Sequence, residues 1–193
     1  MVGAMAKTLK QTDIDDIVVR ARVEAEALSQ LYEKYYERIF RFCVHRLFSK
    51  EIAEDVTSTV FLKVAGGIRS FCGRSERDFR NWLYAIAANQ ANAYIRKTSR
   101  RKRLLAEAAS SFTANTANSD ENGSEPDWPT LYAAILKLKP EHQTIITLRF
   151  FENMEYEQIA KILNARKETL RVTVHRILGK LRKHLHTAFE GEI

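Results

Sequence analysis

Residues 155–185, EYEQIAKILNARKETLRVTVHRILGKLRKHL, constrain the fold of this chain more than any other stretch. Ile159, Ala160 and Leu163 recur at helical spacing, and the small Ala160 lets a second helix cross closely. Asn164 follows, and Asn is one of the few residues besides Gly that adopt the left-handed conformation of a sharp turn. A second apolar stripe at helical spacing comprises Leu170, Val174, Ile177, Leu178 and Leu181. The pattern predicts a helix-turn-helix.

The far face of the second helix is basic. Residues 161–186 contain eight Lys or Arg and one acid, Glu168. Such a face can enter a DNA major groove, where Arg and His reach base edges and other cations reach phosphates. A solvated basic helix on an ordinary bundle is the alternative, but the preceding helix and the Asn turn favour DNA binding.

Composition places the chain among all-α proteins that bind a polyanion. It has 193 residues, three Pro, seven Gly and a net charge of +7 that is concentrated locally. We expect two small helical domains joined by a flexible acidic linker. Because the chain has no apolar run of about 20 residues and no apolar signal-peptide core at its start, we expect no membrane insertion and a cytoplasmic location.

The residues that carry metal or acid-base chemistry are scattered. Cys43 and Cys72 lack the spacing of a zinc site or a disulfide framework, and we expect both to be core or near-core thiols. The acids alternate with bases on predicted helix surfaces; Glu54 and Asp55, for example, are adjacent and diverge on a helix. We therefore predict no catalytic residue, no metal site and no cofactor.

Residues 12–103 are predicted to form the first domain, after a tail at 1–11. Thr12 and Asp15 resemble a capping box before a first helix. An aromatic-rich helix is predicted at 25–47, with Arg46 among its inner-face positions. A further helix from 51 is expected to end at Gly66 and Gly67.

Residues 70–103, SFCGRSERDFRNWLYAIAANQANAYIRKTSRRKR, predict an ordered loop to about residue 80 and then a helix with Trp82 on its buried side. Six of the eight residues 96–103 are basic. Aromatic and amide groups beside a basic helix end can hold single-stranded nucleic acid. An aromatic core with a solvated basic helix end fits the same pattern equally well.

Residues 104–127 predict the flexible linker, because they contain five acids, no Lys or Arg, and many Ser, Asn and Ala. The second domain then spans 128–193. Pro129 begins a helix, and a third apolar helix is expected at 142–154. These two helices would form a platform under the helix-turn-helix.

This order of elements resembles the extracytoplasmic-function (ECF) sigma factors, the small promoter-specificity subunits of bacterial RNA polymerase. In region 2 the resemblance rests on LYEKYYERIFRFCVHR, AEDVTSTVFLKV and WLYAIAANQANAYIRK, and in region 4 on residues 138–185. It covers nearly the whole chain. It implies core RNA polymerase, promoter DNA and an anti-sigma factor as partners, and a chain without the region 1.1 and region 3 domains of larger sigma factors.

The resemblance also implies roles for particular residues. Those facing the minus-35 major groove would be Arg166, Lys167, Arg171, Val172, His175 and Arg176. Those holding the melted minus-10 strand would be Phe71, Arg74, Arg80, Trp82, Asn89, Asn92, Arg96 and Lys97. Those docking on the polymerase clamp would be Asp55, Val56, Phe61, Leu62 and Lys63. The acidic linker would thread toward the active centre.

Three positions depart from the family pattern. Ser58-Thr59 stand where Gln-Glu is usual, which changes the expected polymerase contacts. Glu155 stands where Ser or Thr usually caps the first helix of the motif, and residues 166–170, RKETL, replace the usual Ser-x-Gly-Thr-Val. The apolar frame is intact, so we expect the same fold with a different DNA sequence preference.

Two other functions are consistent with parts of the chain. A helix-turn-helix transcriptional regulator with an N-terminal sensor domain would share the C-terminal half, but a sensor has no need of a Trp/Asn helix that ends in a basic run. A nuclease would need converging carboxylates or a His/Asp metal cluster, and the sequence shows neither.

Overall fold

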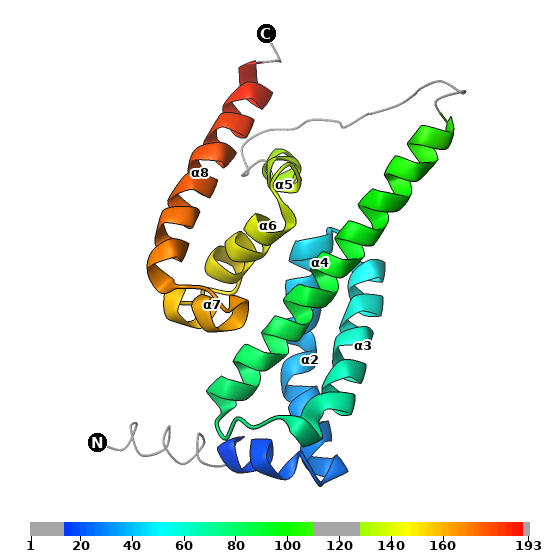
Figure 1. Ribbon diagram of the computed structural model, residues 1–193, viewed down its shortest axis with the longest axis vertical. Helices are drawn as coiled ribbons and strands as arrows, with labels where there is room; N and C mark the ends of the chain where they lie inside the picture. Colours follow the sequence, from blue (N-terminus) through cyan, green and yellow to red (C-terminus); the bar gives the residue numbers. More distant parts are fainter. Residues whose placement is uncertain (1–13, 110–127, 191–193) are drawn as a thin grey trace.

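The structure is a computed structural model that describes residues 14–109 and 128–190. All regular elements in these ranges are helical, which confirms the predicted all-α class (Figure 1). A short helix at 14–20 is followed by α2 (Ala25–Leu47), α3 (Lys50–Gly67), η1 (Ile68–Ser70), α4 (Glu76–Ala109), α5 (Trp128–Leu136), α6 (Pro140–Ile146), η2 (Thr147–Phe151), α7 (Tyr156–Leu163) and α8 (Lys167–Glu190). The predicted tail at 1–11 and the cap at Thr12 lie outside the described residues.

The N-terminal half is a bundle in which α2, α3 and α4 lie side by side (Figure 1). Its core is aromatic, with Tyr35, Phe42 and Phe79 fully buried. α2 ends where Phe48 adopts the left-handed conformation (φ 54°), and Ser49 then caps α3 by accepting the Ile52 N–H at 3.3 Å. The chain thereby reverses direction within two residues.

A reciprocal capping box begins α4. The Asp78 N–H donates to Ser75 Oγ at 3.2 Å, and Asp78 Oδ2 accepts the Ser75 N–H at 3.3 Å. The hydrogen bonds from Ser75 hold the pKa of the Asp78 carboxyl below its usual range. The helix continues to Ala109, six residues beyond residue 103, where the first domain is predicted to end. Residues 110–127, the rest of the predicted linker, are not described.

The second helix of the predicted platform, expected as one helix at 142–154, is instead α6 followed by a widened turn and a bend. α6 begins with Pro140 at its first position and ends at Ile146. The next turn is widened, with the Glu152 N–H donating to Thr147 O at 3.0 Å across five residues. Asn153 (φ 51°) then redirects the chain into α7. Apolar periodicity alone does not distinguish a regular helix from one that widens in its last turn.

Two predicted core residues are exposed. Leu178 is 41% exposed, because the stripe on α8 is narrower than its apolar residues suggest. Cys72 is exposed in the loop before α4, whereas Cys43 is buried as predicted. Burial raises the pKa of the Cys43 thiol to about 11.

Candidate nucleic-acid interface

The predicted helix-turn-helix is formed by α7 and α8. Asn164 has the left-handed backbone (φ 50°, ψ 48°) predicted for the turn, and the Ala165 N–H donates to Ala160 O at 2.9 Å. Glu155 caps α7 in place of Ser or Thr: its side chain accepts the Gln158 N–H, and its own N–H donates to Gln158 Oε1 at 3.1 Å. Glu155 therefore caps the first helix of the motif although it departs from the family pattern.

The predicted minus-35 residues are all exposed, with Arg166 just before α8 and the other five on its exposed face: Lys167, Arg171, Val172, His175 and Arg176. Residues 167, 171 and 175 are four apart and lie on one side of the helix. The Arg171 guanidinium lies 5.8 Å from the Tyr156 ring centroid, so α7 helps to orient it. The opposite side of α8 packs through Leu170, Val174 and Ile177, which are buried.

The loop before α4 joins two of the residues predicted to hold unpaired bases. Phe71 stacks on Trp82 with ring centroids 4.8 Å apart and an interplanar angle of 24°. Both rings are half-buried, whereas Phe79 beneath them is fully buried. The aromatic residues of this region therefore combine core packing with a partly accessible stack. Arg74 is exposed at the loop.

Arg80 is separated from that stack. It lines a groove of about 510 Å³ with Arg38, Arg41 and Glu152. Tyr84 Oη donates to Glu152 Oε2 at 2.6 Å across this groove. Burial raises the pKa of the Glu152 carboxyl above its ordinary value, although the Tyr84 hydrogen bond and the charges of Arg41 and Arg38 oppose the shift.

Further along α4 the predicted residues divide between two environments. Asn89, Arg96 and Lys97 are exposed, and Asn89 and Arg96 line a groove of about 630 Å³ between α4 and the helix-turn-helix. Asn92 is only 8% exposed, and its Oδ1 accepts from Thr144 Oγ1 at 3.1 Å. In this structure Asn92 joins the two halves of the protein.

The interior polar cluster around Arg46 was not predicted as a cluster. Arg46 is 1% exposed, and it donates to Gln143 Oε1 and to Asn92 Oδ1, each at 2.7 Å, and to Pro140 O at 3.3 Å. Burial lowers the pKa of Arg46 to about 10. The sequence indicated only that Arg46 lies on the inner face of its helix, because its partners are distant in the chain.

The predicted polymerase-binding residues lie on α3. Asp55, Leu62 and Lys63 are exposed, and Leu62, at 73%, is a large apolar side chain in water. Val56 and Phe61 are buried in the core. Ser58 and Thr59 lie exposed on this helix.

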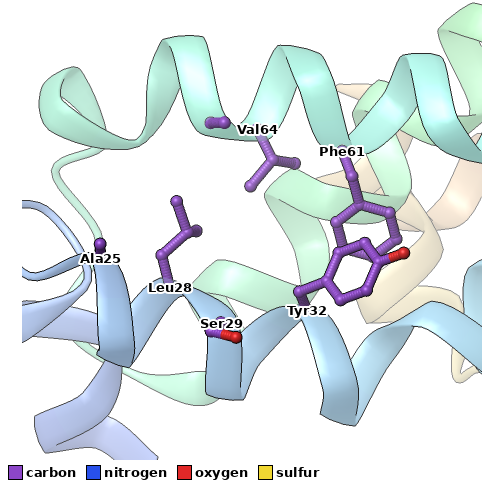
Figure 2. Close-up of a pocket in the computed structure, with 7 residues that line it drawn as sticks. Ala25, Leu28, Ser29, Tyr32, Phe61 and Val64 are labelled. Carbon is purple, nitrogen blue, oxygen red and sulfur yellow. The ribbon is translucent and has the colours of Figure 1, made fainter.

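An apolar pocket of about 250 Å³ lies between α2 and α3, beside this surface. In Figure 2, Leu28 and Tyr32 of α2 face Val64 and Phe61 of α3 across the pocket. The Tyr32 and Phe61 rings meet edge to face with centroids 4.8 Å apart. The surface around Leu62 is therefore partly apolar.

The described residues offer neither a metal-binding cluster nor a membrane-spanning helix. Residues 14–109 and 128–190 contain no group of three His, Cys, Asp or Glu residues arranged to hold a metal ion. Within the same ranges no helix is both long and apolar enough to span a membrane.

Comparison with known proteins identifies both halves of the chain. Residues 31–101 match the family model of Sigma-70 region 2, and residues 134–183 match that of Sigma-70 region 4. The match at 31–101 does not favour the alternative of a sensor domain.

Individual relatives agree. The chain is 30% identical to RNA polymerase sigma factor YlaC of Bacillus subtilis, over 86% of this chain and 96% of the relative. It is also 30% identical to the ECF RNA polymerase sigma-E factor of Haemophilus influenzae, over 79% of this chain and 84% of the relative. The sigma factor RpoE of Bartonella quintana, solved with the anti-sigma factor NepR, shares the fold, with a TM-score of 0.59, 20% identity, and coverage of 82% of this chain and 96% of that one. The chain therefore belongs to the sigma-70 family of RNA polymerase sigma factors, in its ECF group.

Proposed function

We propose that this chain is a promoter-specificity subunit that binds core RNA polymerase, directs it to particular promoters and assists their melting. The exposed basic face of α8, on a well-formed helix-turn-helix, is the observation that carries the proposal. The chain needs no catalytic residue or cofactor of its own, because the polymerase carries the chemistry. Its partners would lie in the cytoplasm of a bacterium, and an anti-sigma factor would regulate it, as NepR is found with the Bartonella protein.

The three surfaces would act on different partners. The exposed face of α8 would read the minus-35 element in the major groove. Phe71, Arg74, Trp82 and Asn89, with Arg96 and Lys97 further along α4, would hold the unpaired minus-10 strand. Residues 12–103 and 128–193 would act as separate domains in this process, and Asn92 could join the minus-10 contacts only after α6 leaves α4.

Polymerase binding would use the exposed part of α3, with Asp55, Leu62 and Lys63 as contacts. The test is a pull-down of purified core RNA polymerase by the tagged full chain. Leu62→Asp should abolish capture, because it places a charge in a partly apolar interface. Val172→Asp likewise replaces an exposed apolar side chain by Asp, but on the proposed DNA-binding face, and it should leave capture unchanged. Equal capture by the wild type and Leu62→Asp would remove α3 from the proposal.

Promoter melting should require the holoenzyme. Extracting a base from duplex DNA costs roughly a few kcal/mol, and the free chain has only its own binding energy to supply this. Permanganate reactivity of thymines should therefore appear with holoenzyme and not with the chain alone. Strand opening by the free chain would contradict the proposal. Loss of opening by holoenzyme carrying Asn89→Ala together with Phe71→Ala would support it.

A further inference from the structure

The loop at residues 71–75 is held by local contacts at both ends, because at its start the Phe71 N–H donates to Ile68 O at 3.1 Å. Asp78 Oδ2 accepts the N–H groups of Arg74 and Ser75, each at 3.3 Å. These bonds tie the end of the loop to the first turn of α4. They do not reach Gly73, the middle residue of the loop, whose carbonyl is held from outside the loop.

The segment at residues 14–22 contacts this loop from outside the bundle. The Glu76 N–H donates to Asp15 Oδ1 at 2.6 Å, and Arg22 Nη2 donates to Gly73 O. The Arg22 guanidinium also lies 6.0 Å from the centroid of the Phe71 ring. Arg22 therefore contacts both the backbone and the aromatic side chain of the loop.

This segment is itself anchored in the core. Val18 is fully buried and Ala21 is 3% exposed, and the Ala21 N–H donates to Ile17 O at 2.9 Å. Asp15 lies on the short helix and Arg22 lies in the turn after it, so both side chains extend from a packed segment and can hold the loop in place. Glu76 is held from a second side, since its Oε1 accepts from Tyr35 Oη at 2.8 Å.

Phe71 has little freedom to move. One face of its ring stacks on Trp82. A Cβ atom added at Gly73 would lie 2.6 Å from Asp78 Cβ and closer still to the Phe71 ring, so the ring packs tightly against the Gly73 backbone. Any change in the orientation of the Gly73 peptide would therefore displace Phe71. Arg22 fixes that orientation through the Gly73 carbonyl.

We propose that Asp15 and Arg22 are positioning residues for the loop at 71–75, and that they set base selectivity in the minus-10 strand without touching DNA. The inference rests on the proposed function, in which this loop holds unpaired bases. A site that is already ordered does not lose binding energy in ordering itself, and a small displacement of a stacking ring weakens its discrimination between bases.

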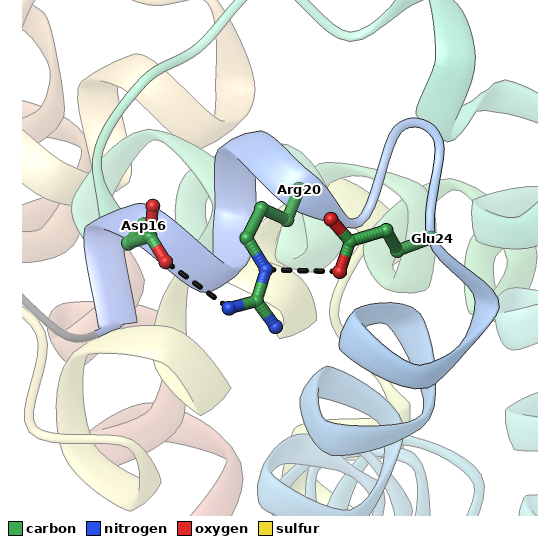
Figure 3. A network of polar contacts seen from close by, with 3 residues as sticks. All are labelled: Asp16, Arg20 and Glu24. Atoms are coloured by element: carbon green, nitrogen blue, oxygen red, sulfur yellow. Dashed lines mark hydrogen bonds and ion pairs between the residues drawn. The ribbon is translucent and has the colours of Figure 1, made fainter.

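The test compares Arg22→Ala with a matched control on the same segment, Arg20→Ala. Figure 3 shows Arg20 between Asp16 and Glu24; its Nη1 lies 3.3 Å from Asp16 Oδ2 and its Nε lies 3.0 Å from Glu24 Oε2. All three side chains are at least 41% exposed, and such surface pairs contribute little to stability. Both substitutions remove an arginine, but only Arg22 contacts the loop.

Holoenzyme reconstituted with each full-length variant would transcribe a library of promoters randomised in both elements, and the transcribed templates would be sequenced. Arg22→Ala should reduce selectivity in the minus-10 element on the order of tenfold and leave the minus-35 preference unchanged. Arg22→Lys keeps a cationic donor and should retain part of the selectivity. Arg20→Ala should match the wild type. Wild-type minus-10 selectivity with Arg22→Ala would overturn the inference.

Phe71→Ala separates the two hypotheses. If Phe71→Ala leaves minus-10 selectivity intact, the proposed role of the loop is wrong. If Phe71→Ala abolishes it while Arg22→Ala and Asp15→Ala do not, the loop reads bases and only the positioning role fails. Acrylamide quenching of Trp82 in the free protein, in a Trp128→Phe background, gives a second measurement if a variant binds polymerase poorly. Quenching should rise in Arg22→Ala and Asp15→Ala but not in Arg20→Ala, and unchanged quenching in the first two would overturn the positioning role.

Discussion

Substituting Gln143 should destabilise the protein more than its single side chain suggests. Gln143 is 3% exposed and accepts a hydrogen bond from the buried Arg46 at 2.7 Å. Its Nε2 also donates to Leu138 O at 2.9 Å and to Leu136 O at 3.3 Å. Because the pKa of Arg46 is still about 10, the guanidinium is charged at neutral pH and needs these acceptors.

The magnitude follows from the bonds lost in Gln143→Ala. A hydrogen bond to a charged group contributes about 1.5–3 kcal/mol, and a neutral one about 1 kcal/mol. The long bond to Leu136 O adds little, so we expect a loss of about 3 kcal/mol in the free energy of unfolding. Arg46→Met with Gln143→Leu removes the charge together with its acceptor, and such replacements are often close to neutral. The double variant should therefore be more stable than Gln143→Ala.

Equilibrium urea unfolding of the full chain, followed by far-ultraviolet circular dichroism, measures this difference. Gln90→Ala is the matched control, because it removes the same side chain from a half-buried position on α4. We expect it to change the free energy of unfolding by less than about 1 kcal/mol. If Gln143→Ala resembles Gln90→Ala, or if the double variant is less stable than Gln143→Ala, the argument for a buried charge that needs its acceptors is refuted.

Three further predictions concern titration, thiol reactivity and DNA recognition. Burial, aided by the nearby Arg41, lowers the pKa of His45 below its ordinary value of 6.5. The unfolded chain therefore binds this proton at a higher pH than the folded chain does, and the free energy of unfolding should fall as the pH drops below 6.5. In His45→Gln the urea midpoint should fall less over the same pH range. A thiol reagent should label the exposed Cys72 rapidly in the native protein and the buried Cys43 only on unfolding, and fast labelling of both would refute this. Arg171→Ala should weaken specific binding by about 1–3 kcal/mol and relax base preference, whereas Lys183→Ala should weaken binding evenly across sequences. Equal losses on specific and scrambled duplexes, measured by fluorescence anisotropy, would exclude Arg171 as a base reader.

Local patterns in the sequence predicted the all-α class, the helix-turn-helix and the basic face of α8. The apolar stripe through Leu170, Val174 and Ile177 fixes which side of α8 is buried, so the exposed side follows from helical geometry. The turn at Asn164 was predictable because few residues adopt its backbone conformation. In each case the information lies within a few residues of the feature.

The features that the sequence did not predict depend on distant contacts. Arg22 meets Gly73 across 51 positions, and Arg46 meets Gln143 across 97. Neither pair has a spacing that periodicity could detect. The widened turn at 147–151 is a further case, because the spacing of its apolar residues is equally compatible with a regular α-helix. Here tertiary packing selects between backbones that local preference does not separate.

At Asn92 the predicted role and the observed contacts involve the same side-chain oxygen, Oδ1. The family resemblance implies that Asn92 contacts unpaired DNA, and its residue type suits that role. In the structure both lone pairs of its Oδ1 have a donor, Arg46 Nη2 at 2.7 Å and Thr144 Oγ1 at 3.1 Å. The same oxygen cannot accept from a base until α4 and α6 separate, and separation would remove hydrogen bonds from a buried cation. The proposed promoter contact at Asn92 would therefore compete with the packing of the two halves for the same hydrogen-bond acceptor.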